Sequence, residues 1–500
     1  MKDILRSRLD EDLDKNALEL LSSLHDDRKI IFEDIIGTLA HNYMLFKQDI
    51  ISLEDFTKIA NALFNILKDF KQGKFELDLK YEDIHPLIES KVIDMIGIES
   101  GGRIHTGRSR NDQVALDIRL KLRTYLLQVR KDAIFFLKNL IEQAEKYKTS
   151  SFPLYTHLQQ AQIGTFGHLI CSYAFELIRH LDRMKECFSR TNLSPLGACA
   201  IGGTSIPINR AITADQLGFN GIILNSVDAI SSRDVLIEHA SIIASLSSFL
   251  SRISEDLILY SSNEYDYIEI GDKFCSVSSV LPQKKNPDTL ELIRANGAIS
   301  MGNLLSQLSL TKGIATGYHR DFQECKPLLW DSYEKLIIIL PLFSGIIKSI
   351  KLNKEIVNQV WKSSNLMALD LAEYLVLNKN FTFRETHEFI ARMVQFLAER
   401  NTSIPNSWDD NEIRNIKEIA KEVLGDEDVI DKEFLIFKDR KDYFNLKSSE
   451  GGPSEEETNK MIQILKGMKK KHDIELKNDR NFIDNKINSF INIVEQLIKN

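Results

Sequence analysis

The amino-acid sequence predicts an all-α protein with a core of unusually long helices. The 500 residues include only 23 glycines and 10 prolines, together about 6.6% of the chain against about 12% in an average protein. So few turn-forming residues argue against a β-sandwich or a barrel. Residues 111–149 and 233–270 contain neither glycine nor proline, which allows two helices far longer than the usual three turns.

Both stretches carry apolar residues at helical spacing. These residues are Leu120, Leu127, Ile134 and Ile141 in the first stretch and Ile242, Leu246, Phe249, Ile253 and Leu257 in the second. Steps of three, four and seven residues place them on one face of a helix. At 1.5 Å per residue, each helix could run for about 55 Å. A helix of that length needs neighbours along its whole extent, so we expect a bundle, and one that subunits can share.

The length of the chain predicts two to four domains, and the pattern divides it into three. Residues 1–107 have the pattern of shorter helices, residues 108–356 form the long-helix bundle, and residues 357–500 form a C-terminal helical domain with shorter, more polar segments. Breaks between the N-terminal helices are expected near Gly37, Gly73, Pro86 and Gly97.

Composition excludes several classes of protein. With 64 basic and 72 acidic residues the net charge is −8, so nucleic acid is not expected as the main partner. Five cysteines without a C-x-x-C pair argue against a zinc framework and fit a reducing compartment. Residues 336–347 are too short an apolar run for a membrane span, and residues 1–14 lack the apolar core of a signal peptide. A cytoplasmic protein without membrane contact is expected.

Three segments do not have the pattern of a packed core. The first, residues 102–112, places three arginines directly before the first long helix, where Ser109, Asn111 or Asp112 can cap the helix start. Guanidinium groups beside the free N–H groups of a helix terminus make an anion site. The alternative is a capped loop whose arginines pair with surface acids. The arginines are Arg103, Arg108 and Arg110.

The second segment, residues 271–288, is a long connection between two helical patterns. It contains three serines, adjacent lysines at 284 and 285, and Asn286 followed by Pro287, which predicts a helix start with Asn286 as N-cap. Loops of this length are usually lids, binding loops or disordered. The serines could supply a nucleophile or base, and the lysines and the asparagine could stabilise an oxyanion. Alternatively, the loop is mobile and solvated and has no such role.

The third segment, residues 155–162, carries His157 at the expected head of another helix. A single histidine there is more often a cap or surface residue than a catalyst, and the histidines inside helical patterns (His168, His180 and His239) are expected to be structural. No H-E-x-x-H and no strand–G-x-G-x-x-G–helix unit occurs. An enzyme built from this chain is therefore expected to work without metal, nucleotide or flavin.

Together, the motifs resemble those of the argininosuccinate lyases, a branch of the fumarase/aspartase superfamily. Residues 278–286 match the superfamily pattern S-S-x-x-P-x-K-x-N, and residues 105–113 (His-Thr-Gly-Arg-Ser-Arg-Asn-Asp-Gln) and 156–159 (Thr-His-Leu-Gln) are similar to the argininosuccinate branch. Further matches occur at 196–210, 232–234 and 318–326. One departure is Val277, where the family usually has glycine. The resemblance implies a three-domain fold whose long-helix bundle assembles into a homotetramer, with each site shared between subunits.

The resemblance also implies a reaction and its residues. The reaction is a β-elimination that cleaves argininosuccinate to arginine and fumarate in arginine biosynthesis, without a cofactor. The implied catalytic residues are Ser278 as base, His157 oriented by Glu291 as the partner of the leaving nitrogen, and Lys284 as a stabiliser of the carbanion. The implied substrate-binding residues are Ser23, Asp27, Ser109, Arg110, Asn111, Thr156, Arg233, Asn286, Tyr318, Gln323 and Lys326.

Two alternatives stay open at this point. A sister lyase acting on adenylosuccinate, fumarate or aspartate would share the superfamily pattern, although the 105–113 and 283–288 segments favour argininosuccinate. A structural protein on the same scaffold, comparable to some lens crystallins, is the second alternative. Retention of Ser278, His157, Lys284 and Glu291 together argues against it.

Overall fold

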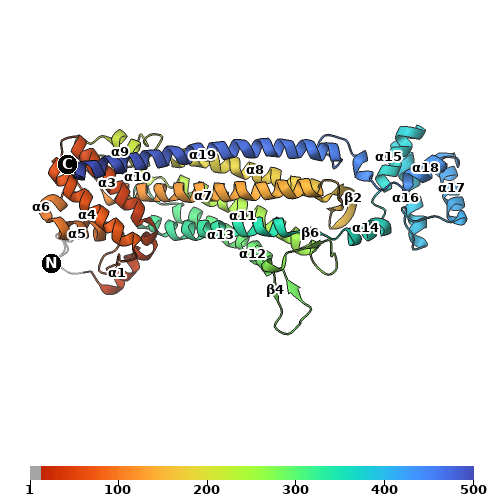
Figure 1. Ribbon diagram of the computed structural model, residues 1–500, viewed down its shortest axis with the longest axis horizontal. Coiled ribbons are helices and arrows are strands. Elements are labelled where there is room, and N and C mark those ends of the chain that lie inside the picture. The colour runs from red at the N-terminus through yellow and green to blue at the C-terminus, as the bar shows by residue number, and fades with distance from the viewer. Residues whose placement is uncertain (1–12, 500) are drawn as a thin grey trace.

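The computed structural model describes residues 13–499, so most of the segment examined for a signal peptide lies outside the described residues. Within the described residues, helices dominate and only three two-stranded sheets occur, which confirms the all-α prediction. The molecule is elongated, with a bundle of long helices in the middle and shorter helices at both ends (Figure 1). No described helix is both long and apolar enough to cross a membrane.

The N-terminal end consists of short helices around a shared apolar core. They are α1 (Lys15–Leu21), α2 (Leu24–Asp27), α3 (Ile31–Lys47), α4 (Leu53–Lys71), α5 (Ile84–Ile96) and α6 (Ile98–Gly101). Gly73 and Gly97, with φ of 70° and 82°, follow α4 and α5 as predicted.

The predicted break near Gly37 is wrong, whereas the one near Pro86 is confirmed because α5 starts two residues before it, at Ile84. Gly37 lies inside α3, where a Cβ atom would come within 2.7 Å of a Leu116 methyl, so glycine here permits close packing of two helices. Pro86 lies in the first turn of α5, where its missing N–H has no helical partner to lose.

The long helices were predicted with unequal success. The first is α7 (Arg110–Tyr147), 38 residues long, as expected. The second is α11 (Asp234–Tyr260), which ends ten residues earlier than predicted. There the chain turns through Asp266, with φ of 47°, and the Tyr267 N–H donates to the Tyr260 carbonyl at 2.9 Å. The other bundle helices are α8 (Phe166–Thr191), α12 (Asp288–Thr311) and α13 (Cys325–Ser349).

The last helix, α19 (Glu455–Lys499), differs most from expectation. At 45 residues it is the longest described helix, although shorter segments were predicted after residue 357. It packs along α7 and α8 and returns the C-terminus to the N-terminal helices (Figure 1), tied by an ion pair of 2.6 Å between Arg130 and Asp479. The divisions at 107 and 357 remain predictions, but α19 lies beside the bundle.

The other end of the molecule has a separate core. It contains α15 (Ala368–Lys379), α16 (Phe383–Glu399), α17 (Asp410–Leu424) and α18 (Lys432–Lys438), and α14 (Lys354–Ser363), whose buried Val357 belongs to the bundle core, leads into it. Buried side chains such as Leu371, Phe389 and Phe434 form an apolar cluster distinct from that of the bundle.

Two β-hairpins occur where the sequence predicted a helix start (residues 155–162) and a loop (residues 271–288). Strands β1 (Ser151–Thr156) and β2 (Gln159–Thr165) pair across His157 and Leu158, whose φ values of 54° and 56° are those of a type I′ turn. The expected helix head at 155–162 is therefore wrong, and α8 starts only at Phe166. Buried Phe152 and Ile163 anchor the hairpin to the protein.

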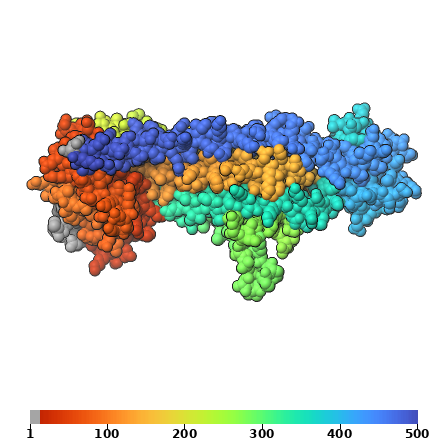
Figure 2. All heavy atoms as spheres, viewed as in Figure 1, coloured from red at the N-terminus to blue at the C-terminus, as the bar shows by residue number. Residues whose placement is uncertain are grey.

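The second hairpin lies in the 271–288 connection. Strands β4 (Ser276–Val277) and β5 (Lys285–Asn286) hold it together, and it projects from the side of the bundle (Figure 2). Asn286 belongs to β5, and Pro287 occupies the N-cap position of α12 without a side-chain cap, so the predicted capping role of Asn286 is wrong. Its pairing with Ser276 holds Asn286 in extended backbone. The remaining strands, β3 (Ile268–Glu269) and β6 (Lys351–Leu352), pair with each other.

Candidate active site

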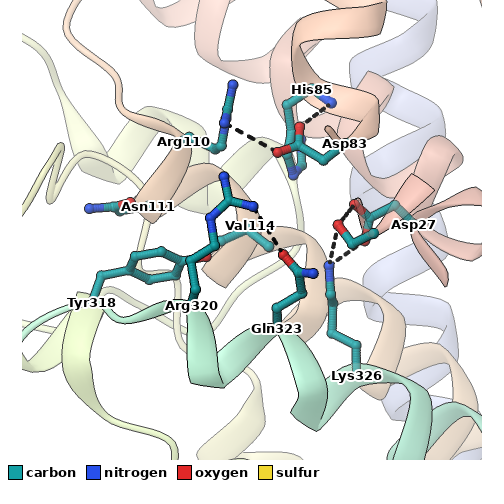
Figure 3. Close-up of a pocket in the computed structure, with 11 residues that line it drawn as sticks. Asp27, Asp83, His85, Arg110, Asn111, Val114, Tyr318, Arg320, Gln323 and Lys326 are labelled. Atoms are coloured by element: carbon teal, nitrogen blue, oxygen red, sulfur yellow. Dashed lines mark hydrogen bonds and ion pairs between the residues drawn. The ribbon is translucent and has the colours of Figure 1, made fainter. Parts of the chain in front are cut away.

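A cavity of about 210 Å³ lies where the N-terminal helices meet the starts of α7 and α13 (Figure 3). Side chains from segments more than 300 positions apart in the chain line it. The lining residues are Ser23, Asp27, Asp83, His85, Arg110, Asn111, Val114, Tyr318, Arg320, Gln323 and Lys326. Seven of them were predicted to bind substrate, so folding brings together most of that predicted set.

The start of α7 positions Arg110 and Asn111 at the cavity. Ser109 is the N-cap, with its hydroxyl accepting the Asn111 N–H at 3.3 Å, while Asp112 accepts the Ser109 N–H at 2.9 Å. This capping box confirms the predicted helix start. Asp112 also accepts the N–H groups of Gly197 and Cys199, each at 2.9 Å, which ties a glycine-rich loop to the helix.

Positive and negative groups alternate around the cavity. Arg110 lies 3.3 Å from a carboxylate oxygen of Asp83, and Arg320 pairs with Glu82. Arg320 also donates to the Gln323 amide oxygen at 3.4 Å. Such a wall suits a ligand that itself carries both carboxylates and a cationic group, because each charge then finds an opposite partner.

Lys326 forms the most enclosed ion pair of the cavity. Its ammonium pairs with Asp27 and lies 3.4 Å from the Ser23 hydroxyl, which donates to Asp27 at 2.6 Å (Figure 3). The two charged side chains are 4% and 0% exposed. The pairing holds the lysine at the cavity wall, where it can still attract a carboxylate.

Arg233 was predicted to bind substrate but does not line the cavity. Its guanidinium lies 4.4 Å from the ring centroid of Phe322 and donates to two nearby backbone carbonyls. Burial lowers the pKa of Arg233 to about 10, so the group keeps its positive charge at neutral pH. Two of its nitrogens are buried and have no hydrogen-bond partner within residues 13–499.

Sequence reasoning missed Asp83, His85 and Arg320. Asp83 is the N-cap of α5 and accepts the His85 N–H at 3.1 Å, so a capping signal before an apolar run was available. Arg320 lies inside the 318–326 match. No local signal distinguishes His85, because its environment comes from α3 and α7.

Within one chain, His157 and Thr156 lie far from this cavity. Both are exposed at the tip of the β1–β2 hairpin. Helix α7 starts at the cavity with Arg110 and ends at Tyr147, just before β1. Its 38 residues span about 57 Å at 1.5 Å each.

The β4–β5 hairpin presents Ser278 with two backbone donors. The Ser278 hydroxyl oxygen accepts the N–H groups of Val280 at 3.2 Å and Leu281 at 3.0 Å. Two N–H groups directed at one oxygen stabilise negative charge on it. The Ser278 oxygen is therefore stabilised in its negatively charged form more than the oxygen of a serine hydroxyl that only water surrounds.

The two lysines of this hairpin differ in role. Lys285 pairs with Asp272 and donates to the Ile270 carbonyl, both at 2.6 Å, so it anchors the hairpin. Lys284 is exposed and has no ion pair among the described residues. Glu291 is exposed on the first turn of α12, and within the described part of the chain no hydrogen bond joins it to His157.

Comparison with known proteins gives a consistent result. A family model described as lyase matches residues 19–302, and a model described as argininosuccinate lyase C-terminal matches residues 365–435. The chain is 38% identical over 506 residues to the argininosuccinate lyase of Methanosarcina acetivorans, covering all of both proteins. It is 43% identical over 390 residues to that of Nitrosopumilus maritimus, covering 78% of this chain and 79% of the relative.

Solved structures agree. The fold is similar to that of an EDDS lyase in complex with formate, with a TM-score of 0.84, 26% identity, and 97% and 95% of the two chains covered. Class II fumarase from Schistosoma mansoni shares the fold at a TM-score of 0.66 and 15% identity over 81% and 91% of the chains.

Proposed function

The chain belongs to the argininosuccinate lyase family, whose members cleave argininosuccinate to arginine and fumarate, and from that premise we propose how its residues share the reaction. The observation that carries the proposal is the single cavity in which Arg110, Asn111, Tyr318, Gln323 and Lys326 converge with Ser23 and Asp27. Argininosuccinate carries three carboxylates and a guanidinium group, which match the alternating charges of this wall.

The binding roles divide by charge. Arg110, Asn111 and Lys326 hold substrate carboxylates, with Thr156 contributing from another subunit and Arg233 through its charge from outside the cavity lining. Tyr318 and Gln323 hold the arginine half, and Ser23 and Asp27 complete the contacts. Ser109 supports this arrangement because its cap determines where the first turn of α7 points.

The chemical difficulty is removal of a weakly acidic Cβ proton beside a carboxylate that is already negative. The electron pair left on Cβ delocalises into that carboxylate as a dianion, and the C–N bond then breaks to release fumarate. Fixed positive charge and hydrogen-bond donors must stand where this charge develops. Lys284 and Asn286 of the β4–β5 hairpin fill that role.

Ser278 is the base in this scheme. A serine hydroxyl accepts a carbon-bound proton only as an alkoxide, and the two N–H groups that its oxygen accepts support such an alkoxide. Closure of the hairpin over the substrate would exclude water and strengthen these interactions. The leaving guanidino nitrogen receives its proton through His157, which Glu291 orients.

A homotetramer with shared sites is part of the proposal. One chain separates His157, the Ser278 hairpin and the cavity along the bundle, so a complete site needs segments from several copies. Helix α12 supports assembly because it buries the polar side chains of Asn296, Ser300 and Gln307 while it leaves five large apolar side chains exposed. The exposed apolar residues are Leu292, Ile299, Met301, Leu305 and Leu308.

A substrate panel tests the function. Purified protein should release fumarate, followed by its absorbance, from argininosuccinate and not from adenylosuccinate, malate or aspartate. Activity confined to adenylosuccinate would show a sister lyase instead. Turnover of none of the four would favour a structural protein on the lyase scaffold. A cytoplasmic location, supported by five free thiols, and a place in arginine biosynthesis belong to the same proposal.

A further inference from the structure

His85 stands between two buried carboxyl groups beneath the cavity wall. Its Nδ1 lies 3.0 Å from an oxygen of Asp34 on α3 and 3.7 Å from an oxygen of Asp117 on α7. The side chains are 3%, 0% and 0% exposed. Gln113 donates to the same Asp34 oxygen that faces the histidine. Three ionisable groups in such confinement cannot titrate independently.

The charges of this cluster follow from its geometry. Burial is the largest single influence and raises the pKa of Asp34, but the charges of His85 and Arg108 and the hydrogen bonds from His85 and Gln113 together outweigh it, so the net shift is downward. Burial, reinforced by the charge of Asp34, raises the pKa of Asp117 well above the ordinary value. Burial lowers the pKa of His85, yet the nearby carboxylates outweigh it and raise the pKa overall. The geometry therefore favours a negative charge on Asp34, the neutral form of Asp117 and a positive charge on His85.

The other ring nitrogen of His85 is unused. His85 lines the cavity, and its Nε2 is buried without a hydrogen-bond partner among the described residues. A buried donor without a partner is costly unless a ligand completes it. The charged or titratable groups that surround the ring are Asp34, Asp117, Asp83, Asp27, His105, Arg108 and Arg110.

We propose that Asp34 is a positioning residue that holds His85 in its cationic form, so that the Nε2–H of His85 donates to a carboxylate of the ligand in the cavity. Asp117 is a neutral neighbour that adds no charge. The identity of the ligand as argininosuccinate or its products rests on the proposed function. The role of Asp34 can be tested by measuring ligand binding, without any measurement of turnover.

Two isosteric substitutions separate charge from packing. Asp34→Asn removes the negative charge next to the ring, whereas Asp117→Asn replaces a carboxyl group that is already neutral. Binding of fumarate and of arginine, the two carboxylate-bearing products, is measured separately by calorimetry between pH 6 and pH 9 on the full-length protein.

At pH 8, Asp34→Asn should weaken the binding of at least one product by about 10- to 100-fold, the worth of a hydrogen bond to a charged group. The loss should shrink as the pH falls toward 6, because the histidine then regains its proton. Asp117→Asn should stay within about threefold of wild type. Equal, pH-independent losses in both variants would make the cluster purely structural and overturn the proposal.

A double-mutant cycle keeps the test decisive. If Asp34 acts through His85, then Asp34→Asn should add no further loss in a His85→Gln background. Should Asp34→Asn fail to fold, His85→Gln alone must show the 10- to 100-fold loss, and wild-type affinity in that variant would refute the idea.

Three further outcomes complete the test. A stoichiometric divalent cation in the purified protein, lost from either carboxyl variant, would overturn the proposal, because the three ligand atoms lie within 4.8 Å of one another and would then be a metal site. Wild-type protein that binds neither product would also overturn it. A wild type that binds products with the expected pH pattern but never cleaves argininosuccinate would refute the proposed function alone.

Discussion

Lys326 and Asp27 form an ion pair that is almost completely enclosed, joining the first turn of α13 to α2 across 299 positions of the chain. The pair lies in the cavity wall and anchors the N-terminal helices to the bundle (Figure 3). It therefore stabilises the contact between these segments, and substitution can separate this effect from the binding role proposed for the two residues.

Asp27→Asn should lower the free energy of unfolding by about 3–5 kcal/mol, because it leaves a buried ammonium without its counter-charge. Urea denaturation measures this change. The double variant Asp27→Leu/Lys326→Met should recover most of the stability, since apolar pairs of similar volume replace buried ion pairs well. It should not recover substrate affinity. A loss below about 1 kcal/mol in Asp27→Asn would mean that solvent reaches the pair.

His157→Asn should lower kcat by roughly 10²–10⁴, the usual worth of general acid–base catalysis. The hairpin should survive, because asparagine tolerates the positive φ of this turn. The matched control is Leu158→Asn, at the neighbouring turn position, where the side chain is 68% exposed; it should lose much less activity. A changed oligomeric state in His157→Asn, measured by light scattering, would instead assign the histidine a structural role.

Ser278→Ala should abolish both turnover and exchange of the succinyl Cβ proton with solvent deuterium, because it removes the proposed base. Mass spectrometry of recovered substrate measures the exchange. Ser279→Ala is the internal control and should stay far more active, since only the Ser278 oxygen accepts the two N–H groups of the turn. Persisting exchange in Ser278→Ala would disprove its assignment as base.

Mixing two inactive variants should restore activity if each site takes His157 and Ser278 from different subunits. Unfolding and refolding an equal mixture of His157→Asn and Ser278→Ala should yield about a quarter of the wild-type sites, because each site then has one chance in two of receiving each native residue. Activity per milligram gives the readout. A mixture no more active than its separate components would place both residues in the same subunit.

Leu305→Lys should break the proposed tetramer into smaller species, because it puts a charge among the exposed apolar residues of α12, where the leucine is 65% exposed in one chain. Analytical ultracentrifugation measures the change. The matched control is Leu377→Lys on α15, where the side chain is 82% exposed; this variant should assemble normally. If both variants assemble alike, α12 is not part of the interface.

Local signals in the sequence were sufficient for α7 but not for α19. The uninterrupted apolar repeat of α7 and the capping box at Ser109 both act within a few residues, so the predicted start and end lie close to the observed ones. Helix α19 is polar over most of its surface and buries few apolar residues, among them Ile462, Leu465 and Phe490. Its length is stabilised by packing on α7 and α8, which no local pattern reveals.

The same contrast applies to the site. The motifs predicted Arg110, Asn111, Tyr318, Gln323 and Lys326 as binding residues, and all five line the cavity. The motifs did not identify Asp83, Arg320 or His85 as lining residues. They also could not show that His157 and Ser278 lie outside that cavity within one chain.

By itself, the sequence determined the helical class, the span of α7, the superfamily and the candidates for the residues that carry the chemistry, because these depend on composition, short-range spacing and motif. Only the tertiary structure decided which of those residues meet, the type I′ turn at His157, the return of α19 and the buried cluster of His85 with Asp34 and Asp117. These features depend on contacts between distant segments. The segments that pack around a buried side chain determine its charge and conformation, and the order of residues along the chain does not reveal which segments those are.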